Sequence, residues 1–207
     1  GDNWSEPVRL ADIGVSAIDP ILIADSIFVT VPFGGNGVFR SVYSSDFGQT
    51  WSSWRRTYIQ GNSYSAVRLD TTLYAVLSVD THNMQCYSSV DHGYRWYYHS
   101  TKLHLEGANA LGTTPSALHM IVERFIQEIY YSRYLFSQPG WSDTLRISDD
   151  STHASFDPEM TAWGDSNIAV IWVDYKYSHY SWTGDILMRR STDNGDSWLP
   201  EQQLTFN

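Results

Sequence analysis

The sequence is poor in charged residues, and those it has are mostly acidic. Charged residues make up 17% of the chain, below the roughly one quarter usual for soluble domains. The 13 basic and 23 acidic residues give a formal net charge of −10. Nucleic-acid binding needs a basic surface, so the sequence argues against nucleic acid as a partner and against anionic membrane surfaces.

Cysteine, long apolar runs and cofactor motifs are also scarce. One cysteine, Cys86, excludes an internal disulfide framework, and we expect it to pack as a small buried hydrophobe. No apolar run approaches the roughly 20 residues that a membrane-spanning helix needs, so no membrane insertion is expected. The seven histidines show no zinc-ligand spacing, and P-loop, dinucleotide and serine-nucleophile motifs are missing. No cofactor or metal is therefore predicted, although Ca²⁺ held by loop carboxylates stays open as an alternative.

What the chain does contain is a phrase of eight residues, Ser-x-Asp-x-Gly-x-x-Trp, that occurs at 44–51, 89–96 and 191–198. Aspartate and serine side chains accept hydrogen bonds from nearby backbone amides, and glycine adopts the positive φ that other residues resist. Tryptophan then buries a large ring. The phrase predicts a tight structural turn between two strands. Its shared residues are Ser44, Asp46, Gly48, Trp51, Ser89, Asp91, Gly93, Trp96, Ser191, Asp193, Gly195 and Trp198.

The phrase resembles the Asp box, also called the bacterial neuraminidase repeat, of sialidases and other β-propellers. In that family it forms the turn between the third and fourth strands of a blade. The resemblance covers the whole chain, because the tryptophans that follow the turns recur at intervals of 47, 45, 45 and 57 residues, about the length of a four-stranded blade. These markers are Trp4, Trp51, Trp96, Trp141 and Trp198. The resemblance implies an all-β propeller of four-stranded antiparallel blades in an extracellular or periplasmic location.

Four full blades are expected within a single domain, and residues 1–11 are expected to supply the outer strand of an incomplete blade. Gly1-Asp2-Asn3-Trp4 matches the second half of the phrase, which is the reason for that expectation. Three explanations stay open: a fragment of a longer propeller, a compact four-bladed ring, and self-association by strand exchange. The expected blades of the domain at 1–207 are 12–58, 59–103, 104–148 and 149–204.

Ligands of such propellers usually meet the face opposite the Asp boxes, and one long loop on that face stands out. The insertion at 174–184 stretches one repeat to 57 residues and is rich in aromatic side chains. Aromatic rings near solvent suit stacking on a sugar, and functional loops often break a repeat length. The alternative is that these rings cover an exposed edge or a neighbouring blade. The predicted ligand-binding residues are Tyr175, Tyr177, Tyr180 and Trp182, with Arg124 from a charged loop.

Four carboxylates are weaker candidates for binding or acid–base chemistry. Asp19 and Asp157 each precede a proline at the start of an expected inner strand, and Glu123 and Glu128 flank a loop. A pair of carboxylates could act as acid and base in glycoside hydrolysis. The structural interpretation is favoured: Asp-Pro initiates turns, and loop charges are usually solvated.

The resemblance does not extend to sialidase catalysis. The resemblance implies that active sialidases have six blades and three arginines, the first of them in an Arg-Ile-Pro motif. This motif is missing here, and Ile18 and Phe156 occupy the positions where that arginine would be. Without clustered guanidinium groups, bidentate capture of a carboxylate has no basis. We therefore expect a non-catalytic propeller that binds a glycan or a protein through its loop face. A glycoside hydrolase related to sialidases is the alternative.

Overall fold

The computed structural model describes residues 23–24, 29–35, 38–53, 55–61, 63–80, 82–103, 105, 109–124, 127–149, 152–177 and 183–206. Within these ranges the chain is all-β, and nothing in them forms a helix that could cross a membrane. Asp19, Tyr180, Trp182 and the expected incomplete blade at 1–11 lie outside the described residues.

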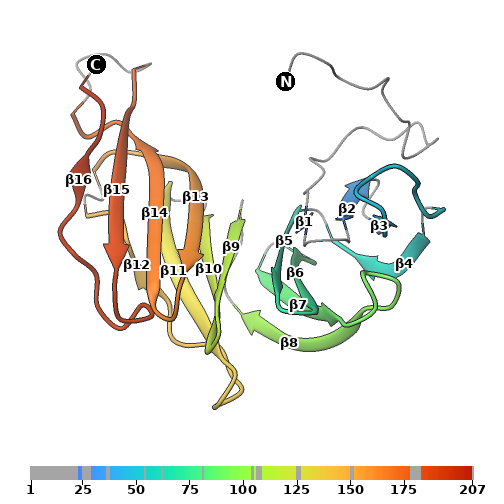
Figure 1. Cartoon of the computed structure of the whole chain (residues 1–207). Helices are drawn as coiled ribbons and strands as arrows, with labels where there is room; N and C mark the ends of the chain where they lie inside the picture. The colour runs from blue at the N-terminus through green and yellow to red at the C-terminus, as the bar shows by residue number, and fades with distance from the viewer. Residues whose placement is uncertain are drawn as a thin grey trace.

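The described strands form four sheets of four strands each (Figure 1), and within each sheet every strand pairs antiparallel with the next along the chain. Sheet 1 contains β1 (Ile23–Ala24), β2 (Val29–Gly35), β3 (Val38–Ser44) and β4 (Arg55–Gln60). Sheet 2 contains β5 (Ser63–Leu69), β6 (Thr72–Ser78), β7 (Asn83–Ser89) and β8 (Tyr97–Leu103). Sheet 3 contains β9 (Asn109–Thr114), β10 (Ala117–Arg124), β11 (Glu128–Leu135) and β12 (Leu145–Arg146). Sheet 4 contains β13 (Ser155–Trp163), β14 (Asn167–Asp174), β15 (Asp185–Ser191) and β16 (Gln202–Gln203).

The hydrophobic pattern explains how the sheets stack. Along β14, Ile168, Val170 and Trp172 are buried at alternate positions, as period-two side-chain placement requires. On β10, Ala117–Val122 are all buried because sheet 3 has a neighbour on each face. One core cluster joins sheets 2 and 3, and a second joins sheets 3 and 4. The prediction of an all-β chain with four-stranded antiparallel sheets is confirmed.

Consecutive sheets meet through their first strands: β1 contacts β5, β5 contacts β9, and β9 contacts β13. Cys86 lies in the core between sheets 2 and 3 and is 2% exposed, as expected from the sequence. Its burial raises the pKa of the thiol to about 12. The free cysteine is thus a packing residue of an inter-sheet core.

The three copies of the phrase form the same turn, each between the third and fourth strands of its sheet. In the first copy, the Ser44 hydroxyl accepts from the amides of Asp46 at 3.2 Å and Gly48 at 2.7 Å, and it donates to the Asp46 carboxylate. The other two copies repeat these contacts. The residue before each glycine is also left-handed, with φ of 56° at Phe47, 58° at His92 and 62° at Asn194. Two successive positive-φ residues therefore make this turn tight; its identification as an Asp box rests on the resemblance.

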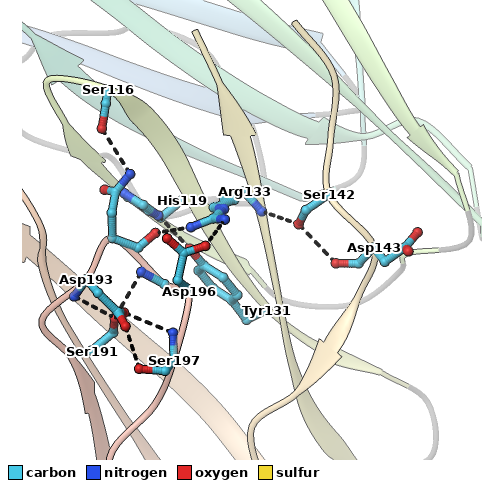
Figure 2. A network of polar contacts seen from close by, with 12 residues as sticks. Ser116, His119, Tyr131, Arg133, Ser142, Asp143, Ser191, Asp193, Asp196 and Ser197 are labelled. Carbon is cyan, nitrogen blue, oxygen red and sulfur yellow. Dashed lines mark hydrogen bonds and ion pairs between the residues drawn. The ribbon is translucent and has the colours of Figure 1, made fainter. Parts of the chain in front are cut away.

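A polar network joins the third turn to sheet 3 (Figure 2). Fully buried His119 contacts the Tyr131 hydroxyl at 2.7 Å through Nδ1 and the Thr114 hydroxyl at 3.1 Å through Nε2. The Thr114 hydroxyl donates to Asn194 Oδ1 at 2.7 Å. Arg133 donates to the Asn194 carbonyl at 2.7 Å and forms an ion pair with Asp196. Sheets 3 and 4 are thus joined by specific polar contacts as well as by apolar packing.

Candidate functional site

The loops opposite the three turns form the candidate functional face. In an antiparallel meander, the β3–β4, β7–β8 and β15–β16 turns lie at one end of the sheets. The β10–β11 and β14–β15 connections, and the links between sheets, therefore lie at the other end. Most of the predicted binding and catalytic candidates fall on this loop face.

The tip of the β10–β11 hairpin contacts the start of β13. The Ser155 amide donates to the Gln127 carbonyl at 2.8 Å, and the Asp157 amide donates to Glu123 Oε2 at 3.1 Å. The structure thus brings together two of the predicted carboxylate residues, Glu123 and Asp157, from neighbouring sheets.

Asp157 has an unusual backbone for a strand residue. We expected it just before the inner strand, but β13 already begins at Ser155, and this detail of the prediction is wrong. Asp157 is exposed, has φ of 50°, and lies where the pairing register shifts between Phe156 and Glu159. Bulges of this kind redirect a side chain and are frequent beside functional sites. Asp157 accordingly remains on the loop face as a candidate.

Arg124 and Glu128 close the same hairpin but have different surroundings. The Arg124 guanidinium lies 4.9 Å from the centre of the Tyr130 ring, which orients a half-buried cation. Glu128 is 2% exposed and accepts a hydrogen bond from the Ser148 hydroxyl, which also accepts from the Ile129 amide. The prediction that Glu128 is a solvated loop charge is therefore wrong. Its hydrogen bond to Ser148 instead holds the segment between β12 and β13 against β11.

Sheet 4 carries a buried polar row at its loop end. Ser155, Asp174 and Asp185 pair across β13, β14 and β15, and all are at most 2% exposed. Asp174 accepts from the Ser155 hydroxyl at 2.8 Å, the Trp172 indole at 3.0 Å and a backbone amide at 2.8 Å. Asp185 accepts from Gln203 and Thr205, both at 3.1 Å. These hydrogen bonds hold the two carboxylates at the two ends of the long loop.

Aromatic side chains lie at the start of that loop. The Tyr175 ring is half-buried and packs edge-on against Phe156, with centroids 5.7 Å apart. Tyr177 is 45% exposed, and the Lys176 ammonium lies 5.3 Å from its ring and 3.0 Å from Glu201. Partial burial opposes the charge of Lys176, but the hydrogen bond and charge of Glu201 outweigh it and raise the pKa of the ammonium.

Sequence reasoning missed the residues that connect these side chains. Phe156 follows the buried Ser155, precedes Asp157 and touches Tyr175, so it links the hairpin contact to the aromatic loop. Asp174 and Asp185 flank the insertion in the sequence, and their positions at its two ends could have indicated from the sequence that they anchor the loop. Among the residues that the structure describes, no three His, Cys, Asp or Glu side chains gather as a metal site would require.

Comparisons of sequence find no relative of the chain: no protein-family model matches it, and no curated protein matches it. Comparisons of structure do find similar folds. An ulvan lyase, a polysaccharide lyase, has a TM-score of 0.60 at 11% identity, over 97% of this chain and 60% of the lyase. The NanB sialidase of Streptococcus pneumoniae has a TM-score of 0.54 at 14% identity, over 82% of this chain and 29% of the sialidase. The lectin of Aleuria aurantia, in complex with Fucα1-6GlcNAc, has a TM-score of 0.55 at 10% identity, over 91% of this chain and 61% of the lectin.

The structural similarity concerns the fold. These neighbours have propeller-like folds and are carbohydrate-active or carbohydrate-binding proteins: a lyase, a sialidase and a lectin. The chain spans about 60% of the length of the ulvan lyase. At this low identity, function has to be argued from the residues of the chain itself.

Proposed function

We propose that the chain is a β-propeller module that binds carbohydrate through its loop face without catalysing a reaction. The loop-face patch consists of Glu123, Arg124, Asp157, Tyr175 and Tyr177. The observation that carries the proposal is the hydrogen bond from the Asp157 amide to Glu123, next to the packing of Phe156 on Tyr175. These contacts connect the Glu123 carboxylate to the backbone of Asp157, and the neighbouring Phe156 to the start of the aromatic loop.

The chemistry of the patch suits a saccharide. Carboxylates and a guanidinium exchange hydrogen bonds with ring hydroxyls, and tyrosine rings stack on the apolar face of a sugar. Tyr177 offers a ring that is 45% exposed, and Arg124 is oriented by Tyr130. The carbohydrate-related proteins among the structural neighbours support this ligand class. A protein ligand is the outcome that a negative glycan screen would favour.

Hydrolysis is the second candidate, favoured by the proximity of Glu123 and Asp157. A glycosidase needs two carboxylates on either side of the scissile bond. Glu128, Asp174 and Asp185 do not suit that role because they are buried and hydrogen-bonded to side chains of the protein. A binding function requires no such pair, so it is the primary proposal.

Calorimetric titration with the leading ligands of a glycan array tests the proposal. We expect Tyr177→Ala to weaken binding at least about tenfold, by removing one stacking platform. Tyr97→Ala is the matched control, because Tyr97 is 55% exposed on the outer strand β8 of another sheet. Equal affinity for the wild type and Tyr177→Ala would contradict the proposal. Turnover of glycosides that disappears in Asp157→Asn and Glu123→Gln would favour the hydrolase instead.

The proposal extends to assembly and location. We propose that the four sheets belong to one propeller with blades near 12–58, 59–103, 104–148 and 149–204. Its ring is completed within this chain, by further sequence of a longer protein, or by strand exchange with a second copy. An extracellular or periplasmic location fits a glycan ligand. Light-scattering mass distinguishes a monomer from a strand-exchanged dimer.

A further inference from the structure

A hollow lies on the opposite rim, between the turns of sheets 1 and 2. It is widely open to solvent, has a volume of about 490 Å³, and is lined by Tyr43, Ser45, Asp91, His92 and Tyr94. The Ser41 hydroxyl donates to the Gly93 carbonyl at 2.6 Å, which fixes one wall against the other. The Tyr43 and His92 rings lie 6.2 Å apart across the boundary between the sheets.

The carboxylate in this hollow differs from those of the other two turns. The Thr50 hydroxyl donates to Asp46 Oδ2 at 2.6 Å, and the Ser197 hydroxyl donates to Asp193 Oδ2. These hydrogen bonds are the largest cause of the low pKa of both carboxyls, about 2 in each case. The corresponding residue of the second turn is Arg95, which has no hydroxyl to donate.

Asp91 therefore makes the hydrogen bonds of its turn through one carboxylate oxygen, Oδ1. Its Oδ1 accepts from the Ser89 hydroxyl at 2.9 Å and from the Arg95 amide at 2.8 Å. The Arg95 guanidinium instead lies 5.6 Å from the centre of the Tyr94 ring. The second carboxylate oxygen of Asp91 thus keeps its acceptor capacity in a half-buried position that lines the hollow.

We propose that this hollow binds one ring of a neutral saccharide, at a second site separate from the loop-face patch. Asp91 Oδ2 accepts hydrogen bonds from sugar hydroxyls, and Tyr94, 40% exposed, supplies the stacking surface. The five lining residues include no lysine or arginine, and the formal net charge is −10. The carboxylate therefore disfavours acidic sugars and selects neutral ones.

The hollow depends on what the neighbouring sheet places against the turn. At the third turn, sheet 3 places Tyr131 and Arg133 against Gly195 and Asn194. A side chain at Gly195 would overlap the Tyr131 hydroxyl. The aspartate of that turn is bonded to Ser197. The proposed site therefore belongs to the second turn and is not a general property of the repeat.

Two substitutions at Arg95 test the role of Asp91 without altering Asp91 itself. Arg95→Ser supplies the hydroxyl that occupies the aspartate in the other turns, whereas Arg95→Ala removes the guanidinium and supplies none. Ligand-observed NMR titrations with methyl glycosides of neutral hexoses, and with glucuronic acid, give the affinities. Both variants lose the guanidinium that lies over the Tyr94 ring, so their comparison isolates the hydroxyl. We expect Arg95→Ser to bind about tenfold more weakly than Arg95→Ala, as for one lost charge-assisted hydrogen bond. Tyr94→Ala is expected to abolish binding.

Further outcomes separate this site from the loop-face patch. Tyr177→Ala should leave binding in the hollow unchanged, so failure of one proposal is distinguishable from failure of the other. Thermal melts of the Arg95 and Tyr94 variants check that each remains folded. Equal affinities for Arg95→Ser and Arg95→Ala would overturn the proposal. So would tighter binding of glucuronic acid than of the neutral glycosides, or no response to any glycoside at millimolar concentration.

Discussion

His119 lies in a chain of hydrogen bonds whose direction is fixed at one end. The Thr114 hydroxyl gives its single proton to Asn194 Oδ1, so it must accept from His119 Nε2–H. His119 Nδ1 is then left to accept from the Tyr131 hydroxyl. In the neutral imidazole the proton is therefore on Nε2. Burial, and next the nearby charge of Arg133, lower the pKa of His119 to about 4.

The buried neutral histidine predicts a loss of stability in mild acid. An unfolded histidine titrates near pH 6.5, whereas the folded one resists protonation until about pH 4. The contribution to stability is thus fully present above pH 6.5 and is lost as the pH falls toward 4, by an amount on the order of 3 kcal/mol. Denaturant unfolding at a series of pH values measures it.

The His119 prediction has a direct control. His119→Gln should flatten the pH dependence of unfolding between pH 6.5 and 4, even if its stability at neutral pH is lower. The equivalent change at His153, which is exposed, is the surface control for the substitution itself. An unaltered slope in His119→Gln would assign the acid sensitivity to other groups.

Individual residues were predictable where their partners are close in the sequence. The repeated serines and aspartates make the local hydrogen bonds that their residue types imply, because each partner lies two to four positions away. His119 gave no such signal, since Tyr131 and Thr114 reach it through strand pairing. The burial of Glu128 was missed for the same reason: Ser148 is 20 positions away.

The β15–β16 turn differs from the other two because its tryptophan packs on β11. In the first two turns, the tryptophan indole donates to the glycine carbonyl at 3.0 Å. The Trp198 indole nitrogen is buried without a partner, and its ring instead packs edge-on against Tyr131 at 5.0 Å. The docked turn thus exchanges a local hydrogen bond for contacts between sheets.

This docking predicts unequal effects of the same substitution in two turns. Gly195→Ala and Gly48→Ala both place a side chain at positive φ, 84° and 81°, which costs about 1–2 kcal/mol. Only at Gly195 would the methyl group overlap a neighbour, the Tyr131 hydroxyl; at Gly48 the nearest atom is a Trp51 ring carbon at 3.3 Å. We expect Gly195→Ala to lose about 1–3 kcal/mol more in urea unfolding.

Removing the overlapping hydroxyl provides a check on the Gly195 prediction. Tyr131→Phe combined with Gly195→Ala should reduce the difference between the two alanine variants only in part, because two ring carbons at 2.6 and 2.9 Å would still overlap the methyl group. If both alanine variants lost the same stability, the turn would move away from β11 at little cost, and the docking would contribute little.

At the level of elements, the alternation of apolar and polar residues predicted the strands but not the bulge in β13. The inner and middle strands follow the expected hydrophobic pattern, as β14 shows. The bulge at Asp157 adds a residue to one strand, which breaks the alternation that places a strand boundary. For this reason the sequence predicted that Asp157 precedes the strand, whereas β13 already contains it.

For the whole molecule, packing between sheets decides how tightly the fold holds together. Met84, Cys86, Leu118, Met120 and Val122 fill the core between sheets 2 and 3. The repeat length predicted this stacking. It could not predict how the long loop or the hollow is lined, since those depend on residues in which the repeats differ.

Cys86 makes the separation of these sheets measurable. Burial and a thiol pKa of about 12 leave almost no reactive thiolate in the folded protein. We expect a disulfide reagent to label Cys86 at least about a hundredfold more slowly than an exposed cysteine, and the rate to rise with urea in step with global unfolding. A Cys86→Ser variant with Thr192→Cys, on an exposed turn position, is the reference. Fast labelling in water would show that sheets 2 and 3 separate locally.

The residue before each turn glycine carries a further consequence. His92 reaches back to Tyr43 of sheet 1, and Asn194 reaches back to Thr114 and Ser116 of sheet 3, whereas Phe47 is 67% exposed. The residue before the glycine differs between the three turns, and in the second and third turns it makes a contact specific to the preceding sheet. The sheets of this chain are therefore not interchangeable: a shuffled order would keep every turn intact but would lose the contacts that His92 and Asn194 make with the preceding sheet.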